Sequence, residues 1–192
     1  MLRALAAALV GLTLVACGGA PAAAPQAPAR TGGASVATPT PVPTSPATTA
    51  TVELASGGSF TIAFRADKAP NTVANFTKKA RAGDYDGTTF HRVVAGFVAQ
   101  GGDPLSKTDP ARAGTGGGQQ PTELSDLPFT KGAVGVARGG DITVSNDSQW
   151  FVCLEDAPHL NGAYTNFGTV TKGLDVVQGI KVGDRIKTIR VD

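Results

Sequence analysis

Residues 85–103 read YDGTTFHRVVAGFVAQGGD. Their apolar side chains fall into two short runs bounded by glycines, a pattern typical of short β-strands joined by a tight turn. We therefore expect strands at residues 88–94 and 97–100. Arg92 lies in the first of these strands, among residues that are mostly apolar.

The segments on either side also favour short strands. Apolar residues alternate on both sides of the Ser-Gly-Gly-Ser sequence at residues 56–59, which predicts a β-hairpin. From Pro70 the apolar spacings of three, four and seven, with a stop at Gly83, predict an amphipathic helix. Further strands are expected at residues 133–137, 149–154, 166–170 and 186–191, and a second short helix at residues 174–180. Such a series predicts a mostly β domain, closed or nearly closed.

The segment 85–103 closely resembles the signature of cyclophilins, a family of peptidyl-prolyl cis–trans isomerases. Supporting motifs stand in the family's order: APNTVANF at 69–76, GTGG at 114–117, SQWFV at 148–152, LNG at 160–162 and FG at 167–168. The resemblance covers residues 51–192. It implies a mainly β fold, a closed antiparallel β-barrel of about eight strands capped by two α-helices.

The resemblance also implies a site that accelerates rotation of Xaa-Pro bonds with no cofactor. With two histidines and no close cysteine pair, the sequence gives poor support to a metal site. Arg92 is the implied catalytic residue. The implied substrate-binding residues are Phe97, Val98, Gln100, Ala137, Arg138, Gln149, Phe151, His159, Leu160 and Tyr164. The partners expected are proline-containing polypeptides, and by family resemblance the domain is expected to be monomeric.

The physical chemistry of the reaction suits an arginine. An Xaa-Pro bond rotates slowly because amide resonance imposes a barrier of about 18–20 kcal/mol. A guanidinium that donates to the prolyl nitrogen would localise its lone pair as the bond twists, and arginine stays charged. One such hydrogen bond supplies about 1.5–3 kcal/mol, so an apolar pocket that holds the ring must contribute as well.

Two groove positions depart from the common pattern. His159 stands before Leu160, where many cyclophilins have a bulky aromatic residue, and this lowers the affinity expected for cyclosporin. Tyr164 replaces a histidine of many eukaryotic members, whereas Ala137 and Arg138 resemble the bacterial subgroup.

The first 50 residues predict a secretion signal followed by a lipid-anchored linker. A 13-residue apolar run, residues 4–16, follows Arg3, and it is too short to span a bilayer but suits a signal peptide. It ends in Leu-Val-Ala-Cys, which resembles a bacterial lipobox. We therefore expect a lipoprotein signal peptide at 1–16, lipidation of Cys17, a disordered Ala/Pro/Thr-rich linker at 17–50 and the isomerase domain at 51–192. The expected location is extracytoplasmic, lipid-anchored to a bacterial membrane.

Charge and cysteine content narrow the partners. From residue 51 onward, 15 basic residues balance 15 acidic ones, which argues against a nucleic-acid partner. Cys17 and Cys153 lie far apart in different settings, so no disulfide is indicated. Cys153 stands in an apolar stretch, and we expect it to be a buried thiol.

Other functions have weaker support from the residues. A hydrolase using His91 or His159 would need a nucleophile elbow of the Gly-x-Ser-x-Gly type, which is missing from the sequence. The glycines at 114–118 lack the Gly-Lys-Ser/Thr ending of a phosphate loop. His91 is expected to be structural, since isomerisation transfers no proton. A catalytically weak chaperone module that binds proline peptides at the membrane remains the alternative.

Overall fold

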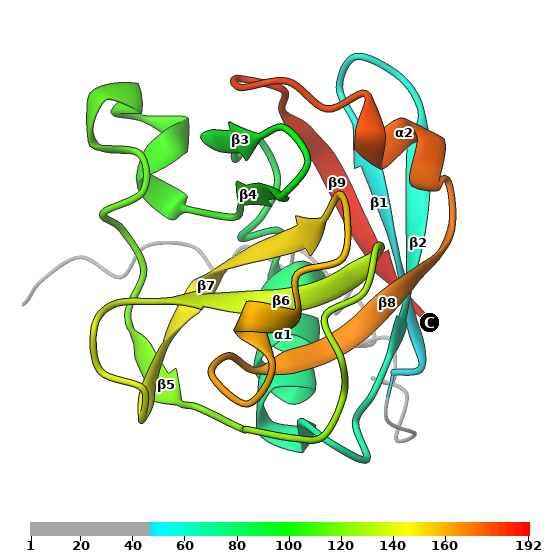
Figure 1. The fold of residues 1–192 in the computed structure, drawn as a ribbon. Coiled ribbons are helices and arrows are strands. Elements are labelled where there is room, and N and C mark those ends of the chain that lie inside the picture. Colours follow the sequence, from blue (N-terminus) through cyan, green and yellow to red (C-terminus); the bar gives the residue numbers. More distant parts are fainter. Residues whose placement is uncertain (1–46) are drawn as a thin grey trace, which may run out of the picture. The chain divides into compact units, whose positions relative to one another are not determined.

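A computed structural model describes residues 47–192 (Figure 1). The predicted signal peptide, Cys17 and the linker up to residue 46 lie outside the described residues. The strands are β1 (Thr49–Leu54), β2 (Ser59–Phe64), β3 (Arg92–Val94), β4 (Val98–Gly101), β5 (Gln119–Pro121), β6 (Ala133–Arg138), β7 (Val144–Cys153), β8 (Asn166–Lys172) and β9 (Ile186–Val191). The helices are α1 (Pro70–Ala82) and α2 (Leu174–Gln178), with 3-10 turns η1 (Pro104–Lys107), η2 (Pro110–Arg112) and η3 (Pro158–Leu160).

The strands form one antiparallel sheet that curls around a core. Its order is β3-β4-β7-β6-β8-β2-β1-β9, and β5 pairs with the N-terminal end of β7. The fold is therefore mainly β with two helices, as the sequence predicts. Strand β1 begins at Thr49 and Ala50 is fully buried, so the folded part starts slightly before residue 51.

The prediction of a closed barrel is wrong at one seam, because β3 and β9 at the two ends of the sheet do not pair as strands. Residues 87–90 face residues 183–186 there, joined by four backbone hydrogen bonds of 2.8–3.0 Å and one isolated bridge, Thr89 to Arg185. The next amides on each side, those of Thr88 and Asp184, donate within local turns to the carbonyls of Tyr85 and Lys181, at 3.0 and 3.1 Å. Because those two donors are used within turns, a regular ladder does not continue across the seam.

Both helices pack against the same inner core. Phe76 of α1 lies 5.0–5.8 Å, between ring centroids, from the rings of Phe64, Tyr85, Trp150 and Phe167. Helix α1 begins at a proline, as helices often do, and its C-terminal cap is a glycine with φ 75°, a conformation that favours glycine. In Figure 1 it lies behind β6 and β7, while α2 lies beside β2 at the other side of the barrel. No helix in the described part of the chain has the length and hydrophobicity needed to cross a bilayer.

Some strand boundaries differ from the sequence predictions. The strand expected at 88–94 is shorter and begins only at Arg92. The residues just before it, 87–90, form hydrogen bonds with residues 183–186 ahead of β9. Strand β7 is longer than predicted, since its polar first half pairs with β6 and with β5. The three-residue β5, Gln-Gln-Pro, was not predicted, because nothing in its residue types favours a strand.

Candidate functional site

The register of four neighbouring strands places one row of residues on the outer face of the sheet. Arg92 of β3 pairs with Gln100 of β4, Gln100 with Phe151 of β7, and Phe151 with Gly135 of β6. Directly paired residues of antiparallel strands point to the same face. The residues next to them along β4, β6 and β7 point into the inner core, so this row faces outward.

Phe151 forms the floor of the site, and Gly135, which pairs with it on β6, leaves room for its ring. A β-carbon on Gly135 would lie 2.5 Å from Phe151 Cζ, which no side chain could accept without a shift. Phe129 stacks against Phe151 with 5.8 Å between centroids and 27° between planes, and Tyr164 meets it edge-on at 6.0 Å and 84°. A second hydrophobic cluster, outside the barrel, thereby supports the site; its buried members are Val98, Phe129, Ala133, Phe151, Cys153, Ala157 and Leu160.

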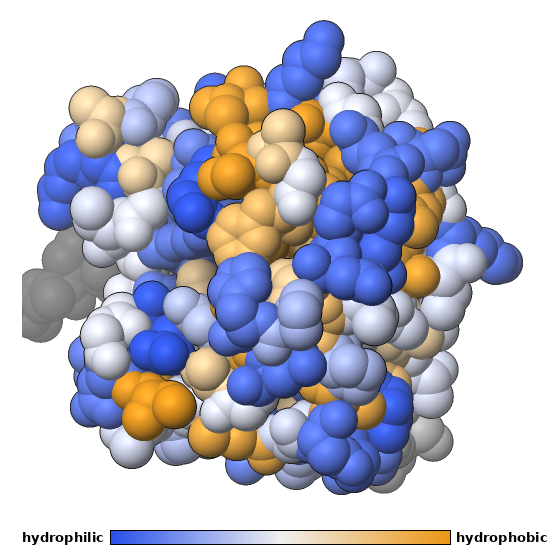
Figure 2. Space-filling model, viewed as in Figure 1, coloured by the Kyte–Doolittle hydropathy of each residue, from blue (hydrophilic) through white to orange (hydrophobic). Residues whose placement is uncertain are grey.

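A groove with a volume of about 230 Å³ lies over this floor. It is lined by Arg92, Phe97, Val98, Gln100, Ala137, Arg138, Phe151, Leu160 and Tyr164. The structure thus brings together nine of the residues that the sequence predicts for the site. Figure 2 shows hydrophobic residues gathered over β3 and β4, with polar residues around them.

Arg92 lies at one end of the groove with its guanidinium exposed. Its Nη1 is 3.5 Å from Gln100 Oε1, and its Cζ is 5.9 Å from the ring centroid of Phe97. Among the described residues no carboxylate forms a salt bridge with Arg92. Its donors therefore remain available to a ligand in the groove.

Gln149 does not line this groove, although the sequence predicts it there. The side chain lies behind Gln100 and Gln149 as a whole is only 4% exposed. Its Oε1 accepts a hydrogen bond from Gln100 Nε2 at 3.0 Å, and its Nε2 donates to the carbonyl oxygen of Gly116 at 2.8 Å. Since Gln100 must donate to Gln149, its own oxygen is turned toward Arg92.

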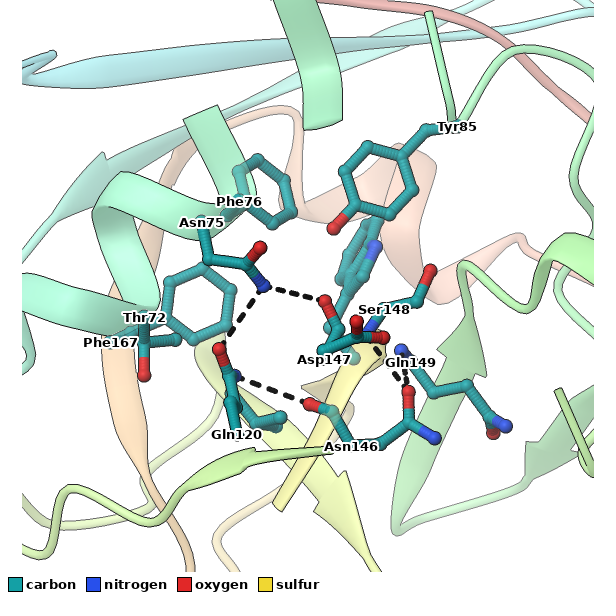
Figure 3. A pocket seen from close by; sticks show the side chains of 12 residues that line it. Thr72, Asn75, Phe76, Tyr85, Gln120, Asn146, Asp147, Ser148, Gln149 and Phe167 are labelled. Atoms are coloured by element: carbon teal, nitrogen blue, oxygen red, sulfur yellow. Dashed lines mark hydrogen bonds between the residues drawn. The ribbon is translucent and has the colours of Figure 1, made fainter. Parts of the chain in front are cut away.

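A set of amide side chains holds this part of β7 against α1 (Figure 3). Asn75 Nδ2 donates to Gln120 Oε1 at 3.1 Å and to the carbonyl of Asp147 at 2.6 Å. Asn146 Oδ1 accepts from the amide of Gln149 at 2.7 Å. The cavity between these residues has a volume of about 10 Å³, room for one water molecule at most, so it serves as support and not as a substrate site.

A polar hollow of about 320 Å³ adjoins the groove, and the sequence assigned it no role. The loop 114–118 forms one wall, and Gln100, Ala137 and Arg138 border both the hollow and the groove. The fully buried carboxylate of Asp103 holds the loop by accepting from the amides of Gly114 and Gly116. The GTGG motif was the only sequence signal of this wall.

The remaining predicted residues lie around the groove. His159 is exposed and its ring lies 5.2 Å from that of Phe97, at the rim. Burial lowers the pKa of His91, and this residue does not line the groove, so its structural role stays a prediction. Cys153 is fully buried beneath the groove, and burial raises the pKa of its thiol to about 12, as expected for an unreactive cysteine.

No three His, Cys, Asp or Glu side chains in the described range 47–192 are grouped as a metal site requires.

Comparison with known proteins agrees with this geometry. The model of the cyclophilin type peptidyl-prolyl cis-trans isomerase family matches residues 49–191. The chain belongs to this family. A peptidyl-prolyl cis-trans isomerase of Synechococcus elongatus is 41% identical over 138 residues, which cover 70% of this chain and 90% of that protein. Peptidyl-prolyl cis-trans isomerase B of Bacillus subtilis is 44% identical over 130 residues, covering 66% of this chain and 85% of that one.

A solved structure shares the fold. The crystal structure of a cyclophilin type peptidyl-prolyl cis-trans isomerase of Cryptosporidium parvum superimposes with a TM-score of 0.67 at 25% identity, over 76% of this chain and 98% of that one. This cyclophilin is therefore a peptidyl-prolyl cis–trans isomerase, and the groove over Phe151 is its candidate active site.

Because Gln149 orients Gln100, replacing Gln149 should slow catalysis without touching the groove surface. Gln149→Leu removes the hydrogen bond that orients Gln100, and a hydrogen bond of this kind contributes about 0.5–1.5 kcal/mol. We expect kcat/KM for a short Xaa-Pro peptide to fall about threefold to tenfold. The measurement is a protease-free isomerisation assay on the Gln149→Leu, Gln100→Leu and doubly substituted proteins.

If Gln149 acts through Gln100, the double variant should be no slower than Gln100→Leu alone. If the double variant instead lost kcat/KM by the product of the two single losses, Gln149 would act independently of Gln100, which would contradict the orienting role.

Proposed function

We propose that Arg92 catalyses the rotation of Xaa-Pro bonds, that the prolyl ring binds over Phe151, and that the enzyme works on secreted or envelope proteins from a lipid anchor. The observation that supports the catalytic part is the cross-strand row of Arg92, Gln100 and Phe151. It joins a cation with available donors to an apolar floor on one rigid sheet.

The two ends of the row have different tasks. The ring of the substrate proline packs among Phe97, Phe151 and Leu160, which all line the groove. With the ring held, the carbonyl of the preceding residue turns around the C–N bond. The Arg92 guanidinium donates to the prolyl nitrogen once that nitrogen becomes pyramidal, so the bond is stronger in the twisted state than in the planar one.

The magnitudes show that Arg92 acts together with the groove. A charge-assisted hydrogen bond contributes about 1.5–3 kcal/mol, and about 1.36 kcal/mol corresponds to a tenfold rate. The arginine therefore accounts for about one to two decades of acceleration. The apolar floor supplies a further part, because a surrounding of low polarity disfavours the charge-separated planar amide more than the twisted one.

The proposed cellular location is supported by the sequence that precedes the folded domain. The apolar run ending in Leu-Val-Ala-Cys resembles a lipoprotein signal, and two or more acyl chains on Cys17 would form a stable anchor. The Pro-rich segment that follows would let the isomerase domain reach unfolded chains outside the cytoplasm. Proline-limited folding of exported proteins is a reaction that such an enzyme would accelerate.

Replacing the arginine tests the catalytic role. Arg92→Ala removes the donor, and we expect kcat/KM for an Ala-Pro peptide to fall about tenfold to a hundredfold. Arg92→Lys keeps the positive charge but lacks the planar guanidinium. Its kcat/KM should lie between the values of Arg92→Ala and the parent. The matched control is Arg81→Ala, which removes an exposed arginine of α1 that does not line the groove. Activity of Arg92→Ala within twofold of the parent protein would refute the assignment.

Labelling tests the anchor. The full chain is produced in a bacterial host supplied with an alkynyl fatty acid, and the incorporated lipid is detected on the protein. We expect label on the parent and on Cys153→Ala, whose thiol is buried, but none on Cys17→Ala. An unlabelled parent protein, or label that persists in Cys17→Ala, would show that the lipid is not attached at this cysteine.

A further inference from the structure

A second arginine stands at the boundary between the groove and the polar hollow. Arg138 lines both, and it shares this position with Gln100 and Ala137. In the proposed binding mode the Arg92 guanidinium donates to the prolyl nitrogen. The residue before the proline is bonded to that nitrogen, and we place its side chain at the boundary that Arg138 lines.

The Arg138 guanidinium is fixed before any substrate binds. Its Nε donates to the carbonyl of Ala163 at 2.7 Å, and its Nη1 donates to the carbonyl of Gly139 at 2.9 Å. Its Cζ lies 4.4 Å from the ring centroid of Tyr164, a cation–π contact. A cation held in this way loses little conformational entropy when it binds a partner.

The charge of Arg138 is not neutralised within the site. In the described part of the chain it forms no salt bridge, and no acidic side chain lines either the groove or the hollow. Asp141 lies near enough to respond to it, but that carboxylate accepts from the amide and hydroxyl of Thr143 at 2.8 and 2.7 Å. Those hydrogen bonds are the main cause of the lowered pKa of Asp141, and the charge of Arg138 has a smaller effect.

Arg92 adds a second cation to the same groove, likewise without a salt bridge among the described residues. Two positive charges at a groove without carboxylates attract anions and repel cations.

We propose that Arg138 makes this isomerase selective for substrates with an acidic residue immediately before the proline. The proposal rests on the assignment of the groove to the Xaa-Pro segment. A glutamate or aspartate at that position would accept from the outward edge of the guanidinium. Because the site is partly open to solvent, we expect a preference of about twofold to fivefold in kcat/KM for glutamate over glutamine.

The experiment compares three peptides that differ only in the residue before proline: glutamate, glutamine or lysine. The ratio of kcat/KM values is measured for the parent, for Arg138→Met and for Arg138→Lys. The matched control is Arg81→Met, which removes one charge of the same sign from α1, outside the groove and the hollow. Each ratio has an internal reference, so a change in overall activity of a variant does not affect it.

We expect glutamate to be preferred over glutamine, and glutamine over lysine, by the parent and by Arg81→Met. The ratios should fall to near one in Arg138→Met, and the parent's ratios should shrink as salt is raised from about 0.05 to about 0.5 M, because salt screens exposed charges. Arg138→Lys should retain part of the preference.

Three results would overturn the proposal. Equal turnover of the glutamate and glutamine peptides by the parent would contradict the charge selection while leaving the isomerase groove intact. A glutamate preference that persists in Arg138→Met would assign selectivity to another group. If the parent accelerated none of the three peptides, the assignment of the groove itself would fail, and the selectivity with it.

Discussion

The missing β-carbon of Gly135 allows Phe151 to lie across the neighbouring strand. A methyl group there would stand 2.5 Å from Phe151 Cζ and 2.6 Å from Phe129 Cε1, so both rings would have to move. The stacked pair of rings is the floor on which the groove depends. Gln100 and Arg92 follow in the same row of the sheet, and their distance from the floor is set by strand spacing alone.

The polar side of the site is set by buried hydrogen bonds. Asp103 has no exposed surface and holds the loop 114–118 through its backbone amides. The carbonyl of Gly116 in that loop accepts from Gln149, and Gln149 orients Gln100. The negative charge of Asp103 is thus used inside the protein, while the charged side chains that line the groove, Arg92 and Arg138, are both cations. A catalyst that donates hydrogen bonds to an amide requires this separation of charge.

The sequence predicted the family, the mainly β fold and most of the groove, because the motif 85–103 and the later motifs specify residue types at fixed positions. The α1 helix with its stop at Gly83 was confirmed for a local reason, since capping is read from neighbouring residues. The open seam was not predictable, because it depends on how the turns at residues 85–88 and 181–184 meet, and these segments come together only in the folded chain. The same holds for the stacking of Phe129 on Phe151 and for the burial of Gln149 against the loop 114–118, because both join segments that are distant in the sequence.

A crystal structure of this protein with a bound Ala-Pro-containing peptide would show directly where the proline binds. We expect the prolyl ring on Phe151, between Phe97 and Leu160, and the Arg92 guanidinium on the side of the prolyl nitrogen. A peptide bound with its proline elsewhere, or with Arg92 turned away from the Xaa-Pro bond, would contradict the catalytic role of the row.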